Sequence, residues 1–290
     1  MGSESASWQQ TLKNTVVFSG MALHTGGRAT ARIEPAPADH GICFIREDVG
    51  DDIAVPAHIR YARDVQRATT IGVDEQHYVV LVEHILSALF GLGIDNARVI
   101  MDGPEPPVLD GSAREIVVKI QEAGIKRLRK KVQTYTVREP VWSRAGDSFL
   151  AFLPGNEKAL RLTCTVSYGV SQLDTQYFSV VLDAERYRQE LAPARTFCEN
   201  YEEIANLMRM GLIRGASLDN AMVICDGAIV CKEGMRFTNE LVRHKMLDIV
   251  GDLALLGRRL QGDIIACLPG HSLNVSLARR IDENDLLIPT

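Results

Sequence analysis

The ten-residue stretch "RHKMLDIVGD" (243–252) carries three chemically active side chains at intervals of four residues. If the stretch is helical, His244, Asp248 and Asp252 share one stripe along the helix. An imidazole and a carboxylate spaced in this way can bind a single metal ion. The same spacing also suits a simple hydrogen bond, and a purely structural interpretation makes the stripe a buried hydrogen-bond network. A metal site therefore needs a further ligand from another part of the chain.

An internal similarity supplies a candidate for that ligand. A valine, a histidine and a glycine recur at one constant offset: Val82, His84 and Gly91 against Val242, His244 and Gly251. His84 thus occupies in the first half of the chain the place that His244 has in the second. We therefore expect His84 to join His244 and Asp248 as the third ligand.

Glu83 and His271 are the candidate base and acid. A zinc ion held by three protein ligands keeps a position open for water and lowers the pKa of that water towards about 7. Glu83 is then placed to take a proton, although an exposed glutamate at a helix start is the simpler interpretation. His271 follows a Pro-Gly turn, where it could protonate a leaving amine or be a loop histidine without a task. His24, at a glycine-flanked turn, stays undecided on chemistry alone, and three histidines are expected at the surface: His40, His58 and His77.

The composition excludes several classes of protein. The 290 residues carry a formal net charge of -5 with both signs scattered, so no basic footprint for nucleic acid is predicted. The basic run "KRLRKK" (126–131) is the exception, and we interpret it as a solvated junction. The six cysteines form no CxxC pair and are expected to be reduced and mostly buried. No apolar run approaches about 18 residues and no leader pattern is present, so we expect a cytoplasmic protein without a stable membrane anchor.

The order of the predicted elements is similar in the two halves. In the first half, strands are predicted over 14–26, 28–37, 41–48 and 96–103, and helices over 79–93 and 114–124. In the second half, helices are predicted over 201–211 and 242–257, and strands over 133–146, 148–156, 159–168, 175–183 and 262–274, the last running into a turn. The sequence therefore predicts an α+β fold of two similar domains, 1–128 and 129–290, from a duplicated strand–helix unit. The opening "MGSESAS" is expected to be disordered.

Seven segments, in order along nearly the whole chain, resemble one enzyme family. They are "GMALHTGG" (20–27), "VEHILSALFGLGIDN" (82–96), "VLDGSA" (108–113), "APARTF" (192–197), "GASLDNA" (215–221), "RFTNELVRHKMLDIVGDLALLGR" (236–258) and "GHSLN" (270–274). Together they resemble the zinc-dependent UDP-3-O-acyl-N-acetylglucosamine deacetylases of lipid A biosynthesis.

The resemblance implies a role for each candidate residue. It assigns Zn²⁺ to His84, His244 and Asp248, and the general base to Glu83. It makes His271 the acid for the leaving amine, oriented by Asp252, and places Lys245 and Thr196 at the developing negative charge or the metal-bound water. It implies substrate contacts at Phe197, Gly215, Ser217 and His24, and an insert around 200–235 that borders a passage for the acyl chain. The implied fold has two similar α+β layers with the active site between them.

The chain departs from the family pattern at Leu268. The family usually has a lysine three residues before the "GH" histidine, where it can meet the phosphates of the substrate, whereas this chain has "CLPGH" (267–271). We therefore expect a weaker phosphate contact there or a compensating residue. Two smaller departures are Ala216 and Ala22, each in place of a glycine.

The leading hypothesis is a zinc hydrolase that removes the N-acetyl group from UDP-3-O-acyl-N-acetylglucosamine and releases acetate. One alternative is a zinc deacetylase of a different acylated amino sugar, and another is a non-catalytic binding homologue. The expected partner is the UDP-linked acylated glucosamine, with no nucleic acid, and the expected oligomeric state is a monomer.

Overall fold

The computed structural model describes residues 8–50, 53–63, 68–155, 158–168, 175–199, 201–225 and 228–290. The segment 1–7, expected to be disordered, lies outside these ranges. Among the described residues, no helix is long and apolar enough to cross a membrane.

The first half of the chain builds a five-stranded sheet. Its strands lie in the order β2 (Val16–Met21), β3 (Arg28–Pro35), β8 (Ala97–Met101), β4 (Ile42–Arg46) and β5 (Ala54–Pro56). Neighbours are antiparallel except for the parallel pair β4 and β8. Burial alternates along β3, where Ala29, Ala31 and Ile33 face the core, as expected for a sheet with one covered face.

The second half builds a sheet of the same plan. Its order is β11 (Val141–Ala145), β12 (Ser148–Leu153), β19 (Gly262–Cys267), β13 (Leu160–Ser167) and β14 (Thr175–Leu182). Again one inner pair, β13 and β19, is parallel and the other pairs are antiparallel. The shared order and directions support the prediction of two similar halves, and their origin by duplication stays a prediction.

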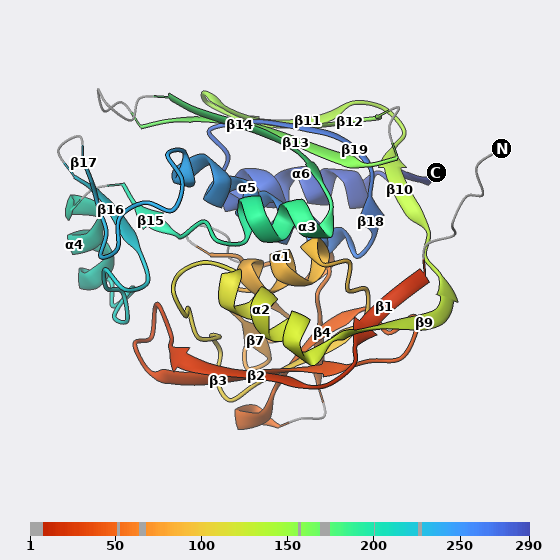
Figure 1. Cartoon of the computed structure of the whole chain (residues 1–290), viewed down its shortest axis with the longest axis horizontal. Helices are drawn as coiled ribbons and strands as arrows, with labels where there is room; N and C mark the ends of the chain where they lie inside the picture. Colours follow the sequence, from red (N-terminus) through yellow and green to blue (C-terminus); the bar gives the residue numbers. More distant parts are fainter. Residues whose placement is uncertain are drawn as a thin grey trace.

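Helices fill the space between the two sheets. Figure 1 shows α5 (Glu240–Leu253) and α6 (His271–Glu283) under the sheet of the second half, and α1 (Glu83–Gly91) and α2 (Arg114–Ala123) over the sheet of the first. Every residue of α5 except Lys245 is buried, because this helix is covered by protein on all sides. The α+β prediction is therefore confirmed.

One glycine allows α1 and α5 to approach each other closely. A Cβ atom added at Gly251 of α5 would lie 2.2 Å from the carbonyl oxygen of Glu83, at the start of α1. Ser87 of α1 also donates a hydrogen bond of 2.9 Å from its hydroxyl to the carbonyl oxygen of Leu247. These contacts bring together the two helices that carry the candidate metal ligands.

The remaining elements are short. Two strand groups join distant segments: β1 (Trp8–Leu12) with β9 (Ile125–Lys131), and β10 (Thr134–Val137) with β18 (Arg259–Leu260) and β20 (Leu287–Pro289). A local pair joins β6 (Ile71–Gly72) with β7 (Tyr78–Val79). The region of the predicted insert holds α4 (Tyr201–Arg209) beside a small sheet of β15 (Phe197–Cys198), β16 (Met222–Cys225) and β17 (Ala228–Val230). Helix α3 (Ala184–Arg186) continues into a π-helical turn, Tyr187–Leu191, and 3₁₀ turns span Glu47–Val49, Ile59–Tyr61 and Ala254–Leu256.

Several local predictions were wrong. The strand predicted over 262–274 ends at Cys267, and α6 begins at His271. Helix α1 starts at Glu83 rather than at 79, because Val79 belongs to β7. His77 is buried and its ring bonds Asp74 at 2.9 Å. Only two of the six free cysteines are buried, Cys43 and Cys164, and the other four are partly exposed. The basic run, by contrast, belongs to strand β9, which is largely exposed as predicted.

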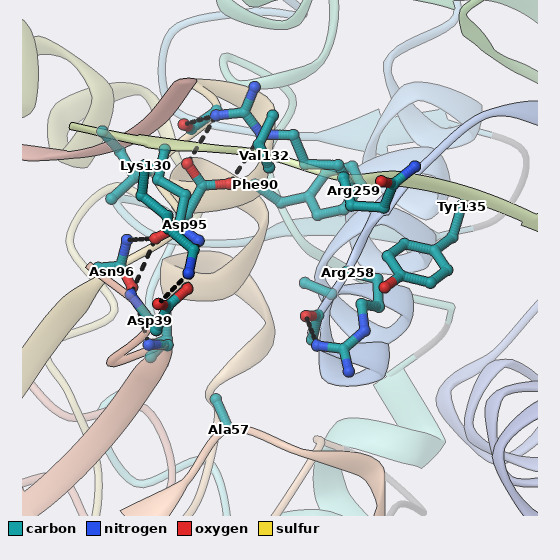
Figure 2. A pocket seen from close by; sticks show the side chains of 18 of the residues that line it. Asp39, Ala57, Phe90, Asp95, Asn96, Lys130, Val132, Tyr135, Arg258 and Arg259 are labelled. Carbon is teal, nitrogen blue, oxygen red and sulfur yellow. Dashed lines mark hydrogen bonds and ion pairs between the residues drawn. The ribbon is translucent and has the colours of Figure 1, made fainter. Parts of the chain in front are cut away.

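A cavity of about 420 Å³ marks the seam between the two halves (Figure 2). Arg259 donates to both carboxylate oxygens of Asp95 at 2.7 Å, and Lys130 lies 3.0 Å from Asp39. The guanidinium of Arg258 lies over the ring of Tyr135, 5.3 Å from its centre. Because most of these polar groups bond one another rather than point into free space, we interpret the cavity as a structural junction.

Candidate active site

A cleft of about 560 Å³ collects side chains from both halves of the molecule. Helix α1 contributes Glu83 and His84, and α5 contributes His244, Lys245 and Asp248. Its other walls come from the first residue of α6, from the loop leading into β15 and from the insert: His271, Thr196, Phe197, Leu207 and Ile213. The cleft shares no lining residue with the seam cavity.

Three of the lining residues form a group that could hold a metal ion. One ligand atom each of His84, His244 and Asp248 lies within 4.8 Å of the others, and all three residues are buried. Asp248 Oδ1 is 3.4 Å from His244 Nε2 and 4.0 Å from His84 Nε2. This buried oxygen has no hydrogen-bond partner, although a buried carboxylate oxygen normally has one. The residues therefore fit a bound cation.

The protonation of the group suits the same role. Burial lowers the pKa of His84 to about 3, with the nearby His244 adding to the effect. Burial also lowers the pKa of His244, whose Nδ1 lies 3.1 Å from the carbonyl oxygen of Ala194. With Nδ1 engaged there, Nε2 is free to bind a cation. Burial alone would raise the pKa of Asp248, but the electrostatic influence of its neighbours, first His244 and then Lys245 and His271, outweighs burial and lowers it.

Glu83 is a buried carboxylate beside this group. Its side chain is 2% exposed, and burial, aided by Asp252 and Asp248, raises its pKa to about 7. Its Oε1 lies 3.7 Å from His271 Nε2. A carboxylate that exchanges its proton near neutral pH is suited to act as a general base. The interpretation of Glu83 as an exposed residue at a helix start is therefore wrong.

His271 is held by a second carboxylate. Its Nδ1 lies 2.9 Å from Oδ2 of Asp252, which is fully buried behind it. Burial would lower the pKa of His271, but Asp252, followed by Glu83 and Asp248, raises it to about 10. The imidazole is therefore a stable cation that can donate a proton. The position at the start of α6 also excludes a loop histidine without partners.

Lys245 and Thr196 line the cleft next to the metal group. Lys245 Nζ lies 3.2 Å from Asp248 Oδ2 and 5.1 Å from the ring centre of Phe197. The segment of Thr196 is fixed at its backbone, since its N–H donates to the carbonyl oxygen of Gly111 at 2.8 Å. The cleft that holds Asp248 is therefore also lined by one cationic side chain and one threonine.

Two of the four predicted substrate contacts line the cleft, and two lie elsewhere. His24 and Phe197 line the cleft, and burial lowers the pKa of His24. Gly215 instead packs against the first half, where an added Cβ would lie 2.1 Å from the carbonyl oxygen of Ala22. Ser217 is exposed, and its N–H donates to Asn220. Neither Gly215 nor Ser217 lines the cleft.

Three aliphatic residues of the cleft have an unusual backbone. Leu81, Ile213 and Leu268 have φ angles of 60°, 49° and 49°, in the left-handed region that side chains other than glycine seldom adopt. Each such residue stores about 1–3 kcal/mol of strain. Leu81 lies two residues before Glu83, and Leu268 lies three before His271, so both precede a proposed catalytic group.

Thr69 and Asn274 are polar residues of the site that the sequence did not single out. Both are fully buried, and both donate a hydrogen bond to Asp252. Asn274 lies in the segment "GHSLN", whose resemblance to the enzyme family could have indicated it. No pattern in the sequence indicates Thr69, because its partner Asp252 is 183 positions away.

The chain is similar to known proteins over nearly its whole length. It matches the LpxC family model, UDP-3-O-acyl N-acetylglycosamine deacetylase, over residues 9–283. Three relatives are each named UDP-3-O-acyl-N-acetylglucosamine deacetylase. That of Geotalea uraniireducens is 42% identical over 267 residues, which are 92% of this chain and 86% of the relative. That of Myxococcus xanthus is 38% identical over 273 residues (94% and 86%), and that of a Nostoc species is 39% identical over 278 residues (94% and 98%).

Proposed function

The chain belongs to the LpxC family of UDP-3-O-acyl N-acetylglycosamine deacetylases, and on this premise we propose that it removes the N-acetyl group from UDP-3-O-acyl-N-acetylglucosamine and releases acetate, a reaction of lipid A biosynthesis. The single observation that carries the proposal is the unpaired, buried Oδ1 of Asp248 between two imidazoles. It lies in the same cleft as a buried base and a buried acid.

Zinc is the proposed metal, held by His84, His244 and Asp248. Two neutral imidazoles and one carboxylate are a ligand set that zinc accepts, with one position left for water. When bound, the ion supplies Lewis acidity and lowers the pKa of a water molecule.

The proposed chemistry of the protein's own residues follows from their positions. Glu83 takes a proton from the attacking water through Oε1, the oxygen that faces His271. His271 gives the proton on Nε2 to the nitrogen that leaves, while its Nδ1–H stays bonded to Asp252. Lys245 and the hydroxyl of Thr196 stabilise the negative charge that develops on the amide oxygen. Proton transfer by a base and an acid in this way contributes typically about 10²–10⁴-fold each.

The walls of the cleft support the proposed substrate class. Phe197 and two residues of the insert around 200–235, Leu207 and Ile213, are apolar lining residues of the cleft. They suit an acyl chain, which this insert was expected to border. Direct contacts of His24 and Phe197 with the substrate belong to the proposal, and those of Gly215 and Ser217 stay predictions. We also propose the two domains 1–128 and 129–290, a monomer without nucleic-acid partners and a cytoplasmic location.

One residue of the cleft, Leu268, supports a second candidate substrate. Leu268 lines the cleft where the family resemblance led us to expect a lysine for the phosphates. An acylated amino sugar without the nucleotide is therefore the second candidate. A non-catalytic homologue is less favoured, because the ligands, the base and the acid lie together in one cleft.

One assay tests the proposal and separates the two substrates. The purified protein, loaded with about one zinc ion per chain, is incubated with UDP-3-O-acyl-N-acetylglucosamine and, separately, with the same acylated sugar lacking UDP. We expect acetate release from the first, and its loss together with the metal in the His84→Ala protein. Acetate release only from the sugar that lacks UDP would show that the second candidate is the substrate. Absence of release from both would support the non-catalytic homologue.

A further inference from the structure

Thr69 contacts both the proposed base and the partner of the proposed acid. It lies just before β6 and is fully buried. Its backbone N–H donates to Glu83 Oε2 at 3.0 Å, and its hydroxyl donates to Asp252 Oδ1 at 2.5 Å. The same hydroxyl lies 3.4 Å from His271 Nδ1. One residue thus connects two carboxylates that come from different helices.

The hydrogen bonds of Asp252 decide which nitrogen of His271 can react. Asn274 Nδ2, which can only donate, lies 2.8 Å from Asp252 Oδ2. The His271 Nδ1 lies 2.9 Å from the same oxygen, so this oxygen accepts from both. The Nδ1 proton is therefore retained, and Nε2, on the side of Glu83, is the nitrogen that exchanges a proton. The Thr69 hydroxyl occupies the other oxygen, which keeps the carboxylate from rotating.

The contact with Glu83 selects an oxygen in the same way. Oε2 is occupied by the Thr69 N–H, and Oε1 lies 3.7 Å from His271 Nε2. The reactive oxygen of the base and the reactive nitrogen of the acid therefore face each other. We infer that Thr69 is a positioning residue, which holds the base and the acid in this fixed relation through its amide and its hydroxyl. The inference rests on the proposed function and deepens it.

The test replaces the hydroxyl and keeps the shape. Thr69→Val removes the bond to Asp252 and leaves the backbone N–H in place, whereas Thr69→Ser keeps both. We expect Thr69→Val to lower kcat by roughly 10–100-fold, as loss of an orienting group typically does, with KM and zinc content unchanged. Thr69→Ser should restore most of kcat. Thr70→Val is the matched control, because Thr70 is the next residue and, among the described residues, the hydrogen bonds to Glu83 Oε2 and Asp252 Oδ1 come from Thr69 and not from Thr70. This variant should turn over like the parent.

A second measurement needs no activity. A proton on His271 Nδ1 that is bonded to a buried carboxylate gives a far-downfield proton NMR signal, which is assigned by its loss in His271→Ala. The signal should be present in the parent and in Thr69→Ser, and shifted or lost in Thr69→Val. If valine lowers the melting temperature, Thr69→Ala repeats the test with a smaller side chain.

The outcomes separate this inference from the proposed function. A parent that releases no acetate contradicts the function, and the NMR signal still decides the role of Thr69. An active parent whose Thr69→Val and Thr69→Ala variants match it in kcat and in the signal overturns the inference. Equal losses in the valine and serine variants would also overturn it, because the hydroxyl would then not be the group that matters.

Discussion

Glu83 illustrates how the surroundings of a single residue support the function proposed for it. Its burial raises the pKa to about 7, so the carboxylate is a stronger base than an exposed glutamate. Glu83→Gln keeps the size and the hydrogen bond to Thr69 but removes the basic oxygen. We expect the variant to retain metal and fold while turnover falls by about 10²–10⁴-fold. Steady-state kinetics with metal analysis provide the check, and parental turnover would show that Glu83 is not the base.

The pH dependence of turnover should report the two proposed groups with opposite signs. Glu83 works without its proton, so the rate rises with pH through its pKa, which is about 7. His271 works with its proton, so the rate falls through its pKa, which is about 10. A bound cation lowers both values, because it favours the charged carboxylate and disfavours the imidazolium. We expect a bell-shaped profile of kcat/KM whose alkaline limb is missing in His271→Ala. An unchanged alkaline limb would assign that limb to another group.

Leu268 allows a test of how the nucleotide is held. A lysine at this position would add a charge-assisted contact to a phosphate, worth roughly 1.5–3 kcal/mol when well placed. We expect Leu268→Lys to lower KM for the UDP-linked substrate with little change in kcat, because the contact is equal in the ground and transition states. The effect should shrink as salt rises. Kinetics at low and high salt provide the measurement, and an unchanged KM would point to a compensating basic residue elsewhere.

The close approach of α1 and α5 is the element-level feature on which the site depends. In Gly251→Ala the new methyl group would lie 2.2 Å from the Glu83 carbonyl oxygen, so the helices must separate. This overpacking should cost about 1–3 kcal/mol, more than the gain of about 1 kcal/mol in helix propensity. Gly103→Ala is the matched control, because nothing lies within 4 Å of its added Cβ. Denaturant unfolding and turnover should both be impaired only at Gly251, and equal stability of the two variants would contradict the packing argument.

The elements also show what the sequence could predict. Strand alternation is a local pattern, and it predicted the sheets. The His and Asp spacing of α5 predicted two residues of the metal group, and the internal similarity between the two halves predicted His84. Helix α6 was not predicted, because the Pro-Gly pair before His271 is typical of a turn. The helical pattern is nevertheless present, since Leu273, Leu277 and Ile281 recur every fourth residue and are buried. Thr69 could not be found in this way, since its role depends on a tertiary contact. The positive φ of Leu268 likewise depends on the structure around it.

For the whole molecule, the metal group links the two halves. His84 lies on α1, and His244 and Asp248 lie on α5. A ligand that binds only the folded protein stabilises it, by about 2.7 kcal/mol at a hundredfold excess over Kd. We therefore expect a chelator to lower the melting temperature and zinc to restore it. His84→Ala is the control, whose melting temperature should respond little to either reagent. An equal response of both proteins would place the stabilising ion elsewhere.

The left-handed backbone conformation of three aliphatic residues in the cleft has a consequence for engineering. Glycine would relieve the backbone strain at Leu81, Ile213 and Leu268, but Leu81 and Ile213 are buried, and loss of a buried side chain costs more than this strain. A selection for thermal resistance alone would therefore be drawn towards glycine only at the half-buried Leu268. The same replacement would remove apolar wall from the cleft and loosen the backbone beside His271. Heat-tolerant variants enriched in this way should be the ones that lose turnover, a trade-off often met where strain is stored at a working site. A library of this protein should therefore be screened for survival and for acetate release together.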